Sequence, residues 1–123
     1  MILDGKKKAY QIDDQLFHCG TTVCLKFIGG KWKSIIIWYL RNGVLRFSEI
    51  KSLIPDITDK MLSLQLKALQ ADGLVEKKTF GSKPPYRVEY QLTEFGKTLV
   101  PVIQHITEWG IRYAEEKGEL VEI

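Results

Sequence analysis

Cysteine and histidine are scarce in this sequence. The 123 residues include two cysteines, Cys19 and Cys24, which are too few for a disulfide framework. If both lie on one helix, their spacing points the two side chains in different directions, which disfavours a bond between them. The two histidines, His18 and His105, form no recognisable metal or catalytic set with the scattered carboxylates. We therefore expect a protein with reduced thiols, no metal or other cofactor, and no enzymatic activity.

Long apolar segments are also missing. The run IIIWYL ends at Arg41 and Asn42, well short of the roughly 20 residues that a membrane-spanning helix needs. The lysines at positions 6–8 are not followed by the apolar segment of a signal peptide. The stretch GGKWKS lacks the spacing of a phosphate-binding loop, which argues against a nucleotide site. These patterns predict a cytoplasmic protein that does not bind a membrane.

Positive charge is concentrated in the middle of the chain. Residues 26–92 contain twelve lysines and arginines against six aspartates and glutamates, whereas residues 93–123 carry a net charge of −3. A basic centre favours a surface that binds a polyanion. The alternative is an ordinary charged surface that contacts only water. Because 45% of this short chain is hydrophobic, we expect one globular domain that spans residues 1–123.

The first part of the chain combines a polar arm with two helical patterns. The arm covers residues 1–18, and a helical pattern begins near Thr22. Glycines at Gly29–Gly30 are expected to end this first helix. A second helix is predicted over residues 31–41, and because it is apolar on most sides, we expect it to lie at the centre of the core.

A helix-turn-helix is predicted over residues 46–73. Ser48 is a suitable N-cap for a short helix that ends before Pro55. Thr58 is a suitable N-cap for a longer helix that ends at Gly73. A short helix, a tight turn and a capped amphipathic helix in this order are typical of the motif.

A β-hairpin and a last helix follow the helix-turn-helix. Residues 74–92 contain two alternating segments on either side of the turn GSKPP, which predicts a hairpin in the position called a wing. Thr93 is expected to cap a final helix over residues 93–123, and Pro101 is expected to kink it. The predicted fold is therefore mainly α with a small β-hairpin wing (α+β), a winged helix-turn-helix.

The longer helix of the motif has an apolar face and a polar face. Its inner face carries mostly apolar residues by helical spacing (Met61, Leu62, Gln65, Leu66 and Leu69). Its outer face carries mostly polar ones (Lys60, Ser63, Leu64, Lys67 and Gln70). In a helix-turn-helix this second helix enters the major groove of DNA. The candidate DNA contacts on it are Thr58, Lys60, Ser63, Leu64 and Lys67, and the alternative is a hydrated helix surface.

The hairpin tip is the second candidate DNA-binding segment. Lys83 and Arg87 supply positive charge where phosphates or a minor groove would lie, and Tyr86 is expected to support the turn. The alternative is a surface hairpin kept soluble by its charge. Lys31, near the start of the second predicted helix, is a further candidate for a backbone contact.

Several segments together resemble the HxlR-type winged-helix transcriptional regulators of bacteria, in the MarR-like superfamily. They are FIGGKWKSIIIWYL, LRFSEIKSLIPDITDKMLSLQLKALQADGLVEK, PPYRVEYQLTEFGKTLVPVI and EWG, and they span roughly Cys19 to Gly110. The resemblance implies a homodimer that binds a pseudo-palindromic operator on double-stranded DNA and dimerises through its N- and C-terminal helices. It also implies that the second helix of the motif reads the DNA. Leu64 is a departure, because family members usually carry a polar residue there; it could contact a thymine methyl or the hairpin.

The same resemblance also implies functions for the last helix and for Cys19. It implies that the stripe Leu99, Ile103, Ile106, Trp109 and Tyr113 is a dimer seam; the alternative is packing within one chain. Many family members keep a cysteine at the place of Cys19, and in some of them it senses electrophiles or oxidants, although proline is typical where this chain has Gly20. If Thr21 or Thr22 caps the first helix, the helix terminus lowers the pKa of the Cys19 thiol. The alternative is an inert cysteine.

The predicted function is sequence-specific DNA binding by a homodimeric transcriptional regulator on an inverted-repeat operator, and Cys19 is either a thiol sensor or an inert cysteine. The alternative is a winged-helix module for protein contacts, or a small-molecule sensor, without specific DNA binding. The sequence predicts no particular effector.

Overall fold

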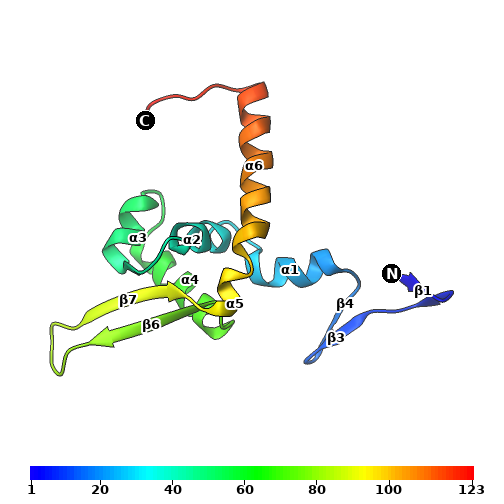
Figure 1. Ribbon diagram of the computed structural model, residues 1–123, viewed down its shortest axis with the longest axis horizontal. Helices are drawn as coiled ribbons and strands as arrows, with labels where there is room; N and C mark the ends of the chain where they lie inside the picture. The colour runs from blue at the N-terminus through cyan, green and yellow to red at the C-terminus, as the bar shows by residue number, and fades with distance from the viewer.

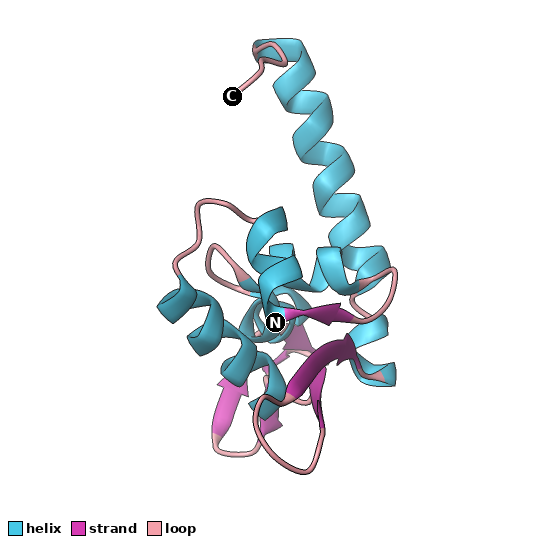
Figure 2. Ribbon diagram, turned by 90° about the vertical axis from the view of Figure 1, so that its left-hand side faces the viewer, coloured by secondary structure: helices cyan, strands magenta, loops and turns pink.

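The computed structural model describes all 123 residues. In chain order its elements are β1 (Ile2–Leu3), β2 (Lys6–Lys7), β3 (Tyr10–Ile12), β4 (Gln15–Phe17), α1 (Gly20–Ile28), α2 (Lys33–Leu40), β5 (Leu45–Arg46), α3 (Phe47–Leu53), α4 (Asp59–Ala71), β6 (Val75–Phe80), β7 (Arg87–Leu92), α5 (Glu94–Lys97) and α6 (Val100–Lys117). A small body carries three projections: the hairpin β6–β7, helix α1 with the N-terminal strands, and helix α6 (Figure 1). Figure 2 shows α6 rising from the body in a second direction of view. The fold is a winged helix-turn-helix, as predicted.

Helix α2 lies at the centre of the core, as its apolar sequence predicts. Ile36, Ile37 and Leu40 on this helix are almost completely buried. Buried residues from α1, α3, α4, the base of the hairpin and the start of α6 complete a single cluster around them. Burial of each such aliphatic side chain stabilises the fold by about 1.5–3 kcal/mol. The core therefore holds the helix-turn-helix and the hairpin to one rigid centre.

The start of α3 differs from the prediction. Ser48 is not its N-cap: the helix begins at Phe47, and Arg46 occupies the N-cap position in an extended conformation. The Oε1 atom of Glu49 accepts a hydrogen bond from the backbone N–H of Arg46 at 2.8 Å, as the third residue of a helix does in a capping box. The pairing of β5 with β7 brings the chain to Arg46 as a strand, which fixes the start of α3 earlier than the serine signal indicates.

Both ends of α4 have well-defined caps. The Oγ1 atom of Thr58 accepts a hydrogen bond from the backbone N–H of Met61 at 3.1 Å, which confirms the predicted N-cap. At the other end Gly73 has φ 75°, a conformation that glycine adopts without strain. The N–H groups of Gly73 and Leu74 donate to the carbonyls of Gln70 and Leu69 at 3.0 and 2.9 Å. This is the Schellman pattern, and it turns the chain directly from α4 into the hairpin.

The predicted hairpin is part of a larger sheet. Strands β6 and β7 are antiparallel neighbours, and β5 pairs with the other edge of β7, so the order is β5-β7-β6. The short strand β5 was not predicted, because two residues are too few for an alternating pattern. One face of the sheet packs on the core through Tyr90 and Leu92, which are buried. We call this three-stranded sheet with its β6–β7 turn the wing.

The last helix is divided in two. Thr93 caps α5 as predicted, because its Oγ1 atom accepts a hydrogen bond from the N–H of Gly96 at 2.9 Å. However, α5 ends at Lys97 and α6 begins at Val100. Pro101 therefore lies in the first turn of α6 rather than inside a longer helix, and the expected kink is absent. A first-turn position removes no hydrogen bond from the helix, because that N–H has no partner in the helix in any case.

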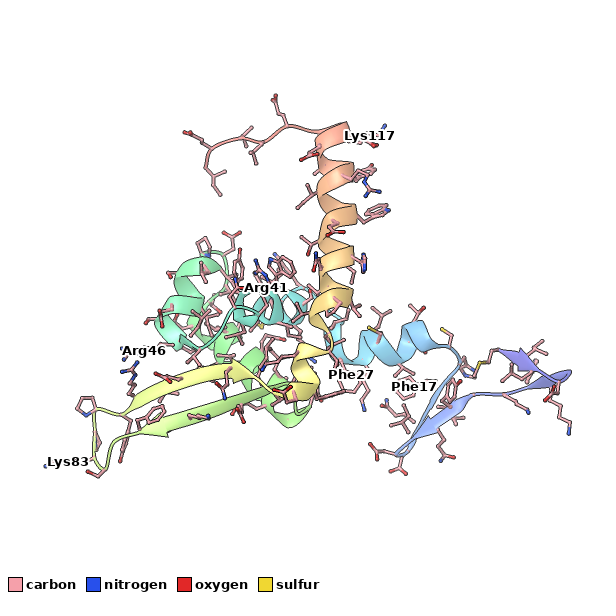
Figure 3. The ribbon with its side chains drawn as sticks, viewed as in Figure 1. Phe17, Phe27, Arg41, Arg46, Lys83 and Lys117 are labelled. Atoms are coloured by element: carbon pink, nitrogen blue, oxygen red, sulfur yellow. The ribbon has the colours of Figure 1, made fainter.

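The N-terminal arm has more structure than the sequence indicates. It forms two small antiparallel hairpins, β1–β2 and β3–β4. Asp4 and Gly5 in the first turn, and Asp13 in the second, have positive φ. The pair Asp-Gly is a common signal for a two-residue hairpin turn. Phe17 is buried and attaches the arm beside α1 (Figure 3). None of the helices in the structure is both long and apolar enough to cross a membrane.

Candidate nucleic-acid interface

The two faces of α4 are divided as predicted. Leu62, Leu66 and Leu69 are buried against the core. Lys60, Leu64 and Lys67 are exposed on the outer face, and Ser63 lies partly exposed between them. The burial of the leucines fixes the rotation of the helix about its axis. This rotation presents two cations and one half-exposed leucine, Leu64, to the outside.

Two polar residues near this outer face already have partners. The Oγ1 atom of Thr58 accepts the N-cap hydrogen bond, so only its hydroxyl proton remains to donate to a phosphate. The side chain of Gln70 donates to the carbonyl of Leu66 at 3.1 Å and is partly buried. Gln70 is therefore directed at its own helix. The residues free to contact DNA on α4 are those in its first three turns.

The wing tip is exposed and basic. Lys83 lies at its far end (Figure 3), and neither Lys83 nor Tyr86 has a hydrogen bond or salt bridge within the chain. The ring of Tyr86 lies beside Gly81, which has φ 108°. An aromatic ring at this place packs on the glycine and supports the turn. The tip therefore carries one cation, and the two prolines that follow it in the chain limit the flexibility of the turn.

Arg87 differs from Lys83 because it has a partner on its own strand. Its Nε atom lies 2.8 Å from Oε1 of Glu89, and the two side chains are 63% and 18% exposed. The remaining guanidinium nitrogens of Arg87 have no partner in the chain. Arg87 is therefore both held in place and open to an external acceptor.

Lys31 lies in the connection between α1 and α2, outside both helices. Its Nζ atom is 4.6 Å from the centre of the Trp32 ring, within the range of a cation–π contact. This contact places the cation over the ring without neutralising it. Lys31 remains an exposed positive charge, but it belongs to neither α4 nor the wing.

Two further cations on the wing, Arg46 and Lys78, were missed by the sequence reasoning. Arg46 is the register partner of Glu89 across β5–β7, and Lys78 is its partner across β6–β7. Both cations are exposed and have no salt bridge. The alternation of β6 and β7 could have placed Lys78 near Glu89, but nothing in the sequence pairs β5 with β7.

The apolar stripe on the last helix is divided between the core and the surface. Ile103 is buried in the core of its own chain, and Leu99 packs beside it. Ile106, Trp109 and Tyr113 are at least half exposed on the part of α6 that rises from the body (Figure 1). The rings of Trp109 and Tyr113 are stacked, with centroids 5.7 Å apart. The exposed part is an apolar surface that the chain itself does not cover.

Cys19 occupies the N-cap position of α1 and is exposed. Thus neither Thr21 nor Thr22 caps this helix, which begins at Gly20; the hydroxyl of Thr22 donates to the carbonyl of Cys19 at 2.8 Å. Hydrogen bonds from the backbone and the hydroxyl of Thr22 lower the pKa of the Cys19 thiol below its ordinary value. Cys24 is partly buried against the core. The two thiols therefore differ in exposure, and Cys19 is the more accessible one.

Comparisons with known proteins identify a single family. The model of the HxlR-like helix-turn-helix family matches residues 27–118. YkvN of Bacillus subtilis (strain 168), an uncharacterized HTH-type transcriptional regulator, is 46% identical over 101 residues, which are 82% of this chain and 85% of YkvN. Among solved structures, the redox regulator HypR in its reduced form has a TM-score of 0.72 at 42% identity, over 76% of this chain and 92% of HypR. The reduced form of YodB from B. subtilis has a TM-score of 0.66 at 34% identity, over 80% of this chain and 96% of YodB.

Proposed function

This chain belongs to the HxlR-like helix-turn-helix family of DNA-binding transcriptional regulators, and we propose that it acts as a homodimer on an inverted-repeat operator. The family is one of regulators rather than enzymes. Each protomer places the outer face of α4 in a major groove and the wing on the neighbouring backbone. Access to DNA also requires that the protein reside in the cytoplasm, which is part of the proposal.

The observation that carries the proposal is that exposed lysines lie both on the outer face of α4 and at the tip of the wing, whose strand β6 directly follows α4. In Figure 1 helix α4 and the wing lie below the base of α6, away from its free end. Lys60 and Lys67 are exposed on α4, and Lys83 is exposed at the tip. Lysines contact phosphates or guanine. Base contacts from α4 and phosphate contacts from the wing together support sequence-specific binding.

The exposed part of α6 supports the homodimer. Ile106, Trp109 and Tyr113 form an uncovered apolar surface at the end of the molecule away from α4. Large exposed apolar surfaces on a small protein are typical of interfaces. Two-fold pairing through this surface leaves both α4 helices free, and two such helices read half-sites about 34 Å apart.

Lys67→Ala tests the role of α4. We expect the variant to bind the operator about tenfold more weakly, with a salt slope reduced by about one, because one fewer counterion is released. The operator is a duplex selected by the wild-type protein from a random pool, and fluorescence anisotropy at several salt concentrations gives both quantities. Lys117→Ala is the matched control, because Lys117 lies at the far end of α6 (Figure 3). Unchanged affinity and slope in Lys67→Ala would contradict the role of Lys67.

We further propose that Cys19 makes DNA binding responsive to thiol oxidation. HypR is a redox regulator with a similar structure, and Cys19 is exposed with a lowered pKa. The thiolate is the reactive form, so a lowered pKa raises the reactive fraction near neutral pH. Diamide accepts two electrons and two protons from two thiols as they form a disulfide. Cys19 of the two protomers would provide them, because the spacing of Cys19 and Cys24 on one helix disfavours a bond within one chain.

Oxidation with diamide is expected to weaken operator binding in the wild type and in Cys24→Ser, but not in Cys19→Ser. The alkylation rate of Cys24→Ser, in which Cys19 is the only thiol, should fall as the pH is lowered through the pKa of Cys19, because the thiolate becomes protonated. Thr22→Val removes one of the stabilising hydrogen bonds, so the midpoint of this pH profile should move to higher pH. An equal response of Cys19→Ser and wild type to diamide would rule out Cys19 as the sensor.

A further inference from the structure

Four charged residues gather on the outer face of the wing, the face away from the core. Glu89 lies on the central strand β7. Its register partners are Arg46 on β5 and Lys78 on β6, and side chains of directly opposite residues lie on the same face of a sheet. Arg87, two residues before Glu89 on β7, shares this face because strand side chains alternate. We call Arg46, Lys78, Glu89 and Arg87 the wing cluster.

The wing cluster is not neutral. Glu89 forms one salt bridge, to Nε of Arg87 at 2.8 Å, and Arg46 and Lys78 form none. Glu76, the register partner of Gln91, is a second carboxylate on this face, so the three cations leave one positive charge in excess. Opposite charges across a strand pair stabilise a sheet, but like charges near one another destabilise it. A face with such an excess gains stability when an external anion binds to it.

The geometry of the Arg87–Glu89 pair suits the binding of a phosphate. A guanidinium has five N–H donors in a planar fork. Glu89 occupies the Nε side of this fork, so both terminal nitrogens remain available for a bidentate contact with phosphate oxygens. Glu89 is 18% exposed and Arg87 is 63% exposed, so the carboxylate is the fixed partner and the arginine the accessible one. Holding a long side chain in one orientation before binding lowers the entropy lost on binding.

The position of Arg46 indicates where a DNA backbone would lie relative to the cluster. It is the N-cap residue of α3, the first helix of the helix-turn-helix, and in this motif the first helix crosses the backbone. Figure 3 shows Arg46 on the wing side of the body, nearer to the centre of the molecule than Lys83 at the tip. A backbone that passes from α3 to the wing tip therefore runs along the wing cluster. Phe80, the register partner of Arg87, is an exposed apolar residue at the edge of the cluster, but the three cations favour an anion over an apolar ligand.

We propose that the wing cluster is a seat for DNA phosphate, in which Arg87, Arg46 and Lys78 bind phosphate oxygens and Glu89 is the positioning residue that orients Arg87. This inference rests on the proposed function, because it assumes that α4 and the wing contact one duplex. According to this proposal, Glu89 raises the affinity for DNA, although a negative charge alone would lower it. A carboxylate near phosphate weakens binding by repulsion, whereas a carboxylate that orients an arginine strengthens it.

Two substitutions at Glu89 separate these effects, because both remove the same charge. Glutamine keeps an oxygen that accepts the Arg87 Nε hydrogen bond, and alanine does not. We expect Glu89→Ala to bind the selected operator about fivefold more weakly than wild type, and Glu89→Gln to bind at least as tightly as wild type. In an Arg87→Ala background the two substitutions should have equal effects, because there is no arginine to orient. In an Arg87→Lys background, which keeps the charge without the fork, the two substitutions at Glu89 should likewise have equal effects.

Binding is measured by fluorescence anisotropy on the selected operator and on an unrelated duplex of equal length, and thermal unfolding confirms that each variant folds. The losses in Glu89→Ala and Arg46→Ala should be similar on both duplexes, because phosphates carry no sequence information. Equal tightening by Glu89→Ala and Glu89→Gln would overturn the proposal while leaving operator binding intact. Failure of the wild type to bind either duplex would overturn the proposed function as well, so the two failures are distinguishable.

Discussion

Gly96→Ala is expected to lower the free energy of unfolding by about 3 kcal/mol. A Cβ atom at this position would lie 2.1 Å from the carbonyl oxygen of Leu74. Neither segment can move apart easily. The N–H of Thr93 donates to that same oxygen at 3.1 Å, and the hydroxyl of Thr93 donates to the carbonyl of Gly73 at 2.6 Å. The substitution must therefore break the contact that holds α5 to the end of α4.

Gly20→Ala is the matched control for this prediction. A Cβ atom at Gly20, in the first turn of α1, meets nothing within 4 Å, so its effect should be within about 0.5 kcal/mol. Urea unfolding followed by circular dichroism, at equal protein concentrations because dimerisation adds to stability, gives both values. Similar midpoints for the two variants would contradict the close contact at Gly96.

Trp109→Glu is expected to convert the proposed dimer to monomers and to weaken operator binding by at least about a hundredfold. Trp109 is 66% exposed within one chain, so its substitution leaves the core of the protomer intact. In the dimer it would bury a charge without a partner at the interface, which is strongly unfavourable. A monomer then binds one half-site without the gain in affinity from the second. Sedimentation equilibrium measures the first effect and operator titration the second.

Ile111→Glu is the matched control on the same helix. Ile111 is also about half exposed, but it lies about 200° around the helix from Trp109, away from the stripe. We expect this variant to remain dimeric and to bind the operator like the wild type. A Trp109→Glu protein that sediments as a dimer would show that the exposed stripe of α6 is not the seam.

The parts of the fold that could be predicted from the sequence are those with strong local signals. The helix α4 has a cap at Thr58, an inner face with four apolar residues and a glycine just after its end, and each of these signals lies within the helix or next to it. The hairpin β6–β7 likewise has alternating strands around a proline turn. Shorter elements gave no such pattern. The strands β1 to β5 contain two or three residues each, and their existence depends on pairing rather than on periodicity.

The candidate site could be predicted only in part, for the same reason. Helical spacing was enough to separate Lys60 and Lys67 from the buried leucines of α4. Spacing was not enough to separate Ile103, which is buried in its own chain, from Trp109, which is exposed, because both belong to one stripe. What decides between them is where α6 leaves the body, and this depends on tertiary packing. The pairing of Glu89 with Arg46 depends in the same way on the register of β5.

The carbonyl group of Leu74 lies where three segments meet: the end of α4, the start of the wing and the helix α5. Leu74 ends the cap of α4, precedes the wing, and lies against Gly96 at the root of the segment that continues into α6. Because these contacts hold the segments together, we expect the wing and the base of α6 to move as one unit. A small tilt of one α6 against another is magnified at the wing tip, because the tip lies far from the base of α6 (Figure 1). In the proposed homodimer, a change in the angle between the protomers would therefore alter the distance between the two wing tips without any rearrangement inside either protomer.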